Sequence, residues 1–213
     1  NPSGAEGFNF ELSPSEAISY ELGWKGQWQK FKLETNLFLI ESSNEILPYE
    51  LEEFPGRSFY RNTGATQRYG LELVAQYKYK EWELRTSITQ AKYLFKGSDN
   101  NLDNSLPGIP NSQIFLQLGY TTNNSLNFLI TAEHIGDLYA NNSNTVKVES
   151  FQSVRFQIGK SFNFNNIDLT LSGGINNIFN ERYFDNIRLN AFGKRYYEPA
   201  PTRNAYLGFQ IEI

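Results

Sequence analysis

Nine segments of this chain alternate apolar and polar residues, and the gaps between them alternate between short and long. The segments are Ala17 to Lys25, Trp28 to Glu41, Gln67 to Tyr79, Trp82 to Phe95, Ser112 to Thr121, Leu126 to Gly136, Phe151 to Phe162, Ile167 to Ile175 and Asn204 to Ile213. A period of two places apolar side chains on one face of a β-strand and polar side chains on the other. Antiparallel strands with tight turns at one end and long loops at the other are the plan of a transmembrane β-barrel.

The gaps have the composition of turns and loops. Short turns are expected at Gly26-Gln27, Lys80-Glu81, Asn123-Asn124 and Asn163 to Asn166. Long gaps run from Ser42 to Ala65, Lys96 to Asn111, Asp137 to Glu149 and Asn176 to Arg203. The long gaps are rich in Asn, Asp, Gly and Pro, which favour irregular structure, so they are predicted as loops.

Alternation alone does not say which way the apolar face points, because a soluble sandwich or a lipocalin-like barrel would turn that face inward. Three features favour a membrane barrel. Strands of roughly 9–14 residues are long enough to cross a bilayer at a tilt. The polar face carries charged residues in mid-strand, as expected for a wet interior: Lys32, Glu34, Glu72, Arg85 and Arg155. Aromatic residues gather near the short turns, where an interfacial girdle is expected: Trp24, Trp28, Tyr77, Tyr79, Trp82, Tyr120, Phe162 and Phe164.

Composition narrows the classes of function. The 213 residues include no cysteine, which excludes thiol chemistry and Cys-ligated metals, and a net charge of −4 does not indicate nucleic-acid binding. Aromatics make up 15% of the chain, which suits membrane interfaces. The chain contains no run of 18 apolar residues, so no transmembrane helix is predicted. The chain opens on a polar stretch, Asn1 to Gly4, rather than a signal peptide, so we expect a processed chain or a fragment.

Catalytic and metal-binding patterns are weak. His134 is the single histidine, so a zinc site or a Ser-His nucleophile has little support, and we expect it at the surface or rim. Asp99, Asn101 and Asp103 are spaced like the start of a calcium loop, but the glycine and glutamate that such a loop needs further on are missing. We therefore expect a solvated Asx-rich turn there, no catalytic residue, no metal site and no cofactor.

Four short motifs resemble the C-terminal part of the β-barrel of a TonB-dependent outer-membrane receptor. In chain order they are Leu12-Ser13-Pro14-Ser15-Glu16 followed by Tyr20-Glu21-Leu22-Gly23; Asn62-Thr63-Gly64 followed by Gly70-Leu71-Glu72; Asn176-Asn177-Ile178-Phe179-Asn180 with Tyr183; and Pro199 with Arg203 before the final strand. The order matches the family, and the resemblance covers nearly the whole chain. The chain departs from the family in ending on Ile213 rather than Phe.

The resemblance implies a piece of a larger barrel. Family barrels have 22 strands around an N-terminal plug that contacts TonB, whereas this chain offers about nine strands, an odd number that bacterial single-chain barrels avoid. Residues 1–213 are therefore expected to be one C-terminal barrel segment without a plug domain. By resemblance, the parent receptor takes up a scarce nutrient, most often an iron chelate, with energy delivered through TonB. Its partners would be the plug, the rest of the barrel, outer-membrane lipid and a small-molecule substrate.

The last strand carries a candidate insertion signal. Leu207, Phe209, Ile211 and Ile213 alternate on one face and resemble the signal read by the barrel-assembly machinery. Because outer-membrane barrels keep short turns in the periplasm, and this strand follows a long loop, the C-terminus is expected on the periplasmic side of the outer membrane.

Two long gaps concentrate arginine and tyrosine, and these residues are the candidate substrate-binding groups. They are Arg57, Tyr60 and Arg61 in the first gap, and Tyr183, Arg188, Arg195 and Tyr196 in the last. Arginine forks bind carboxylates and other planar anions, and tyrosine supplies stacking and hydroxyl contacts. The pattern suits an anionic chelate such as a ferric siderophore, and equally a planar ring or a sugar face.

Two other functions stay open at this point. One is a complete small outer-membrane barrel that acts as an adhesin or structural protein. The other is a soluble lipid-binding barrel with its apolar face inside, which a preparation stable without detergent would support.

Overall fold

The computed structural model describes residues 11–54, 56–62, 64–96, 101–164, 167–191, 193 and 196–212. Nine long strands form one antiparallel sheet in the order β1-β2-β5-β6-β7-β8-β11-β12-β15. Their bounds are β1 Glu16–Gln27, β2 Phe31–Ser43, β5 Ala65–Tyr79, β6 Trp82–Lys96, β7 Ser112–Thr121, β8 Leu126–Ile135, β11 Phe151–Phe164, β12 Ile167–Asn176 and β15 Asn204–Glu212. Within the described residues, the chain forms no helix long and apolar enough to span a bilayer.

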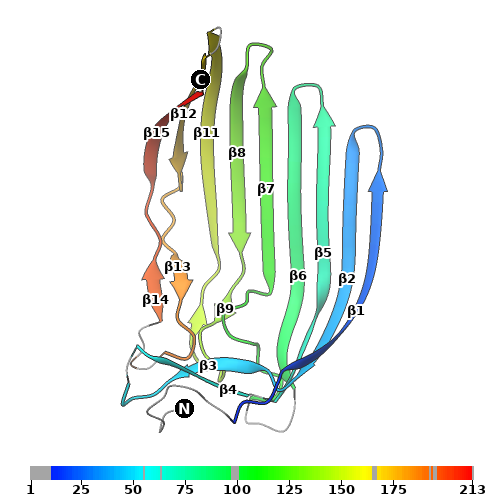
Figure 1. Ribbon diagram of the computed structural model, residues 1–213, viewed down its shortest axis with the longest axis vertical. Helices are drawn as coiled ribbons and strands as arrows, with labels where there is room; N and C mark the ends of the chain where they lie inside the picture. Colours follow the sequence, from blue (N-terminus) through cyan, green and yellow to red (C-terminus); the bar gives the residue numbers. More distant parts are fainter. Residues whose placement is uncertain are drawn as a thin grey trace.

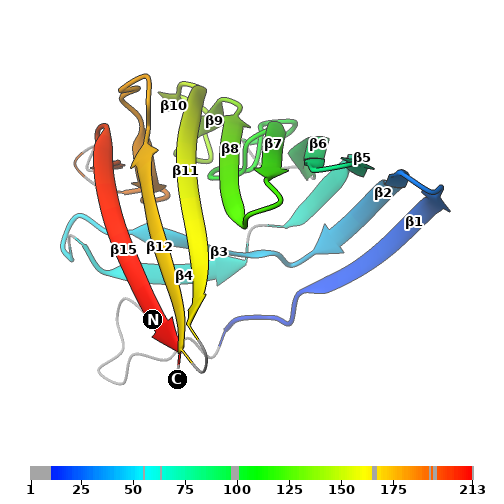
Figure 2. The same cartoon turned by 90° about the horizontal axis from the view of Figure 1, so that it is seen from above.

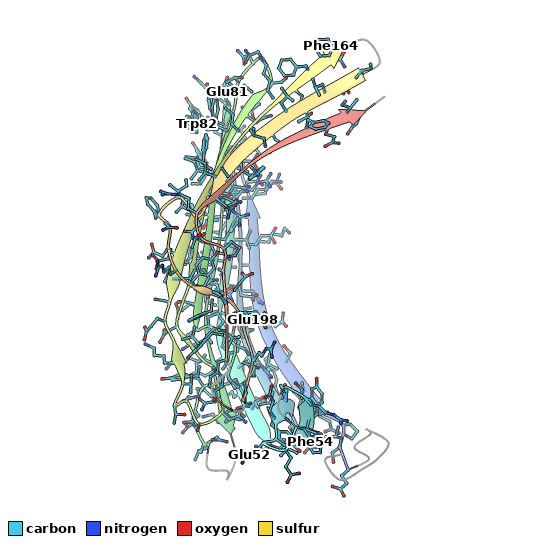
Figure 3. The ribbon with its side chains drawn as sticks, turned by 90° about the vertical axis from the view of Figure 1, so that its left-hand side faces the viewer. Glu52, Phe54, Glu81, Trp82, Phe164 and Glu198 are labelled. Carbon is cyan, nitrogen blue, oxygen red and sulfur yellow. The ribbon has the colours of Figure 1, made fainter. Side chains whose placement is uncertain are left out.

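The sheet is an up-and-down meander in which each long strand pairs with the next one along the chain. It curls into an open half-barrel, with β1 at one edge and β15 at the other (Figures 1 and 2). The two kinds of end are clearly separated: Glu81, Trp82 and Phe164 lie at the short-turn end, and Glu52 and Phe54 at the opposite, loop end (Figure 3). The predicted all-β, antiparallel architecture is confirmed.

All nine predicted strands form, but two predicted turns were misplaced. The turn expected at Gly26-Gln27 lies instead between Gln27 and Phe31, because Gly26 stays in the ladder opposite Leu33. The Trp28 N–H donates to the Phe31 carbonyl over 2.8 Å and closes that turn. Asn163 and Phe164, expected in the next turn, instead belong to β11, where Phe164 pairs with Ile167; residues 165 and 166 lie outside the described residues.

The long gaps contain three short hairpins that the sequence did not predict. These are β3 Ile46–Glu50 with β4 Ser58–Asn62, β9 Leu138–Tyr139 with β10 Lys147–Val148, and β13 Phe184–Ile187 with β14 Tyr197–Pro199. Their strands are too short for a period-two pattern to stand out, and two of them contain a proline. The β3–β4 hairpin extends across the open side of the half-barrel at the loop end (Figures 1 and 2).

The register of the sheet separates an apolar face from a polar one. Leu22, Leu37 and Leu71 lie opposite one another on β1, β2 and β5, and on the other face Asn36 lies opposite Glu72. The aligned apolar side chains are not covered by protein: Leu22 is 72% exposed and Leu37 is 52% exposed. A contiguous exposed apolar surface of this kind marks contact with a membrane or a partner.

The polar face lines the hollow of the half-barrel. Arg68 is on this face of β5, and its Nη2 lies 2.8 Å from the Glu45 Oε1 at the entry to the β3–β4 hairpin. Because that hairpin lies across the hollow, the face that carries Arg68 is the concave one (Figure 2). The apolar face is therefore convex, as in a barrel with lipid outside and water inside.

Most buried hydrophobic side chains of the described residues lie in the long connections, and Ala91 and Phe95 of β6 are buried as well. Ala140 and Val148 of the β8–β11 connection pack with Ala191 and Tyr196 of the β12–β15 connection, with Leu138, Val146 and Ile187 against them. The loops thus have a small core of their own, which gives them a defined shape.

Candidate functional site

Asparagine side chains tie the long connections together at the loop end. The Asn190 Nδ2 donates to the Pro48 carbonyl over 3.1 Å and to the Asn142 Oδ1 over 2.9 Å. In return, the Asn142 N–H donates to the Asn190 Oδ1 over 2.9 Å. One side chain of the last long gap therefore holds both the β3–β4 hairpin and the connection between β9 and β10.

A second tie links the connection after β6 to the same region. The Asn144 Oδ1 accepts from the Ser105 N–H over 2.7 Å, and its Nδ2 donates to the Ser105 carbonyl over 2.9 Å. The Asn104 Nδ2 donates to the Asn142 carbonyl over 2.9 Å. All four long connections are thereby joined into one loop assembly.

This loop assembly borders a polar pocket of about 470 Å³ that is open to solvent, and we call it the loop cavity. Its lining comes from the β3–β4 hairpin, the connections after β6 and β9, and the last long gap: Tyr49, Glu50, Arg61, Asn101, Asn141, Asn142, Ser143, Asn190 and Tyr196. A concave site built from several loops and lined by convergent polar groups is the usual form of a small-molecule site.

Two of the predicted binding residues, one from each gap, meet in this cavity. The Arg61 guanidinium lies over the Tyr49 ring, 5.0 Å from its centroid, which holds the fork in a defined orientation. Tyr196 belongs to the last long gap. It is only 8% exposed, because it packs into the loop core. Arg61 is thus the fixed cation of the site and Tyr196 part of its wall.

Arg57 and Tyr60, the other residues of the first cluster, differ in their surroundings. The Arg57 guanidinium lies 5.2 Å from the Phe59 ring centroid and 6.0 Å from that of Phe54. Tyr60 is 52% exposed on β4. Neither residue lines the loop cavity.

The other residues of the last gap are engaged elsewhere. Two Arg188 N–H groups donate to the Glu198 Oε1 over 3.1 and 3.2 Å, clamping β13 to β14. Hydrogen bonds from Asn186 and Arg188 hold the pKa of the Glu198 carboxyl below its usual value. Tyr183 stacks on Phe151 with ring centroids 4.0 Å apart. Arg195 lies outside the described residues.

Sequence analysis missed most of the cavity wall. Tyr49, Glu50 and the asparagines were read only as loop composition, and the signal that could have singled them out is the density of asparagine in the long gaps. Asparagine side chains readily bond to backbone groups of turns, which is the role several have here.

No metal site appears in the part of the chain that the structure describes. His134 lies near the end of β8, opposite Ile114 and Gln152 on the apolar face, and its Nδ1 is buried without a hydrogen-bond partner. Asp103 of the calcium-like stretch pairs with the Lys96 Nζ over 2.5 Å, and Asp99 lies outside the described residues. In the described part of the stretch, residues 101–103 form a turn, and its Asp103 is held by the ion pair with Lys96.

Charged groups on the concave face pair within strands as well as between them. Arg85 pairs with Glu83 of its own strand, not across to a neighbour, and the Lys78 Nζ reaches the same carboxylate over 3.5 Å. The Gln76 Nε2 donates to it over 2.5 Å. Lys78, Glu83 and Arg85, with Lys80 and Glu81 of the β5–β6 turn, line a second pocket of about 420 Å³ at the short-turn end of the concave face.

The final strand presents the predicted insertion signal on an open edge. Leu207, Phe209 and Ile211 are 93%, 77% and 54% exposed on the apolar face of β15, which pairs only with β12 among the described residues. Ile213 lies outside the described residues, and the role of all four as a signal stays a prediction.

The architecture and the sequence point to the same family. A family model described as TonB dependent receptor-like, beta-barrel, matches residues 1–178. The chain belongs to this family. Receptor barrels of this family sit in the bacterial outer membrane and serve transport rather than catalysis. The predicted membrane-barrel fold and outer-membrane location are therefore confirmed, and the soluble lipid-binding alternative is ruled out.

Solved receptor structures share the fold of this barrel segment. The ferric-catecholate import receptor Fiu from E. coli K12, in its closed form, aligns with a TM-score of 0.71 and 21% identity over 99% of this chain and 29% of its own. The ferric citrate transporter FecA, in its unliganded form, aligns with a TM-score of 0.76 and 21% identity over 92% of this chain and 31% of its own. The ferric yersiniabactin uptake receptor FyuA from Yersinia pestis aligns with a TM-score of 0.74 and 16% identity over 93% of this chain and 30% of its own. The chain thus spans under a third of the length of each.

Proposed function

We propose that this chain is the C-terminal barrel segment of an active-transport receptor whose loop assembly captures a ferric siderophore or a similar small anionic chelate. The observation that carries the proposal is the loop cavity, which places Arg61 beside Tyr49, Asn190 and Tyr196. A guanidinium presents donors in a fork that matches carboxylate and other planar anionic groups, and nearby aromatic rings offer flat contact surface.

The receptors of similar structure support an iron chelate as the cargo. They include receptors for ferric catecholate, ferric citrate and ferric yersiniabactin, although a copper transporter, OprC, is also among them. A cavity of about 470 Å³ has the size of small-ligand sites in proteins.

The remaining parts of the receptor follow from the family. We propose that residues 1–213 form a single barrel segment without a plug, that a plug domain and further strands complete the pore, and that TonB acts through that plug. The unpaired outer edges of β1 and β15 in the described sheet fit strands supplied from elsewhere. The short turns would face the periplasm, with the C-terminus on that side, and the loop assembly would face outward.

The test is chelate binding to the complete receptor in detergent, measured with ⁵⁵Fe-loaded citrate and a ⁵⁵Fe-loaded catecholate siderophore. Arg61→Ala is expected to weaken binding of the cognate chelate about tenfold or more, since a charged hydrogen bond contributes about 1.5–3 kcal/mol. Arg188→Ala is the matched control, because it removes the same charge from a loop residue that Glu198 already neutralises. Equal affinities of the wild type and Arg61→Ala for a chelate that binds would refute the proposed site.

A further inference from the structure

Two lysines at the short-turn end share one aromatic ring. The Lys30 Nζ lies 4.6 Å from the centroid of the Tyr79 ring, and the Lys80 Nζ lies 5.5 Å from it. Lys30 belongs to the β1–β2 turn and Lys80 to the β5–β6 turn. The two turns are held side by side because the Lys78 N–H donates to the Lys30 carbonyl over 2.8 Å. We call Lys30 and Lys80 the turn-end lysine pair.

This pair has no carboxylate partner among the described residues. By contrast, Lys25 pairs with Glu34 over 2.5 Å and Lys78 with Glu83 over 3.5 Å on the concave face of the same strands. Glu81 follows Lys80 in the turn, yet its carboxylate forms no ion pair with either lysine in the described contacts. Both ammonium groups lie near one ring without a carboxylate, and an anion that contacts both would offset their positive charge.

The surroundings of the pair are those of a membrane interface. Tyr79 is 43% exposed and Trp82 is 47% exposed, next to one another on the apolar face. Trp24 and Trp28 form a second group on β1 and its turn, with ring centroids 5.8 Å apart and exposures of 50% and 52%. Exposed tryptophan and tyrosine at strand ends lie at the level of lipid headgroups.

Gly26 makes room for the tryptophan platform. It lies between Trp24 and Trp28, and a Cβ at this position would be 2.6 Å from the Trp24 ring and 2.7 Å from the Trp28 ring. The two indoles, tilted by 45° to each other, therefore approach the backbone of β1 closely at Gly26 and form an exposed apolar surface near the β1–β2 turn.

We propose that the β1–β2 and β5–β6 turns bind an anionic phospholipid, with the turn-end lysine pair on its phosphate and the tryptophans against its glycerol and first methylenes. Basic side chains beside apolar surface at a bilayer interface are the known basis of anionic-lipid recognition. The site is independent of the transported substrate. Only its assignment to the periplasmic leaflet rests on the orientation proposed above.

The test is native mass spectrometry of the complete receptor in detergent, titrated with phosphatidylglycerol and, separately, with phosphatidylethanolamine. Lys30→Gln/Lys80→Gln is expected to weaken phosphatidylglycerol binding about thirtyfold, and each single change about fivefold, at about 1 kcal/mol per lysine. Phosphatidylethanolamine binding should not change. The conservative variant Lys30→Arg/Lys80→Arg keeps the charge and should keep the affinity.

Lys96→Gln/Lys147→Gln is the matched control, because it removes the same charge from the loop end and should leave lipid binding unaltered. If the Lys30→Gln/Lys80→Gln variant binds phosphatidylglycerol as tightly as the wild type does, the proposal is overturned. Displacement of the lipid by inorganic phosphate at equal concentration would also overturn it, since the site would then recognise a free anion. Iron-chelate binding is measured in the same samples, so that failure of the lipid site and failure of the substrate site are distinguished.

Discussion

The sheet and the loop assembly differ in how far their apolar side chains are buried within the protein. On the sheet, large apolar side chains such as Leu22 and Leu207 remain exposed, and the strands are held mainly by their backbone ladders. In the loop assembly, Leu106 and Ala140 are 2% and 0% exposed, and asparagine side chains satisfy the turns. The contrast fits a sheet whose apolar face is covered by lipid, whereas the loops bury apolar side chains of their own.

The largest expected effect comes from a charge on the convex face. Leu71→Arg should lower the free energy of unfolding by about 2–4 kcal/mol, because a mid-strand cation would face hydrocarbon. The measurement is urea unfolding of the complete receptor folded into lipid vesicles. Asn36→Arg, on the concave face of the neighbouring strand, is the control. Comparable losses in both variants would remove the distinction between the two faces.

A smaller and local effect is expected in the loop assembly. Asn190→Ala removes hydrogen bonds to the Pro48 carbonyl and to Asn142 at once, so the loops should loosen by about 1–3 kcal/mol. Hydrogen exchange should rise in β3 and around Asn142 while the sheet keeps its protection. Asn124→Ala, in the short β7–β8 turn, should leave the loops unaffected. Faster exchange throughout the sheet of Asn190→Ala would mean that the two regions are not separate.

The smallest effect is a pH dependence confined to one hairpin. The pKa of Glu198 is lowered in the folded state, so its stabilising contribution is present above the usual carboxyl value of 4.5 and is lost as pH falls through the lowered value. Below about pH 4.5, the Arg188 clamp should therefore weaken and amide exchange in β13 and β14 should increase. Glu198→Gln should abolish this change, and its persistence in that variant would assign it to another group.

The sheet could be predicted because its information is local and repeated. Leu33, Leu37 and Leu39 specify one face of β2 by period two, and a strand slipped by one residue would turn all of them to the wrong side. The turn predicted at Gly26 was misplaced because the prediction used neighbouring residues alone. Glycine often indicates a turn, but Gly26 stays in the strand ladder and leaves room for the Trp24 and Trp28 rings.

The loop assembly could be predicted only in part, because it depends on distant contacts. Asn190 and Pro48 are 142 residues apart, and no spacing rule connects them. The arginine and tyrosine clusters were found by composition, and one member of each, Arg61 and Tyr196, meets in the cavity. Arg188 and Arg57 look equivalent to Arg61 in the sequence, but Glu198 and two phenylalanine rings engage them.

The central claim is that the convex face meets lipid and the concave face meets water, and neighbouring residues of β5 test it most directly. The chain contains no cysteine, so Leu71→Cys and Glu72→Cys can each carry a single nitroxide label in the complete receptor reconstituted into bilayers. The account predicts that relaxation of the label at position 71 responds mainly to oxygen, which concentrates in lipid, and at position 72 mainly to a water-soluble nickel chelate. The reverse pattern, or equal responses at both positions, would contradict it.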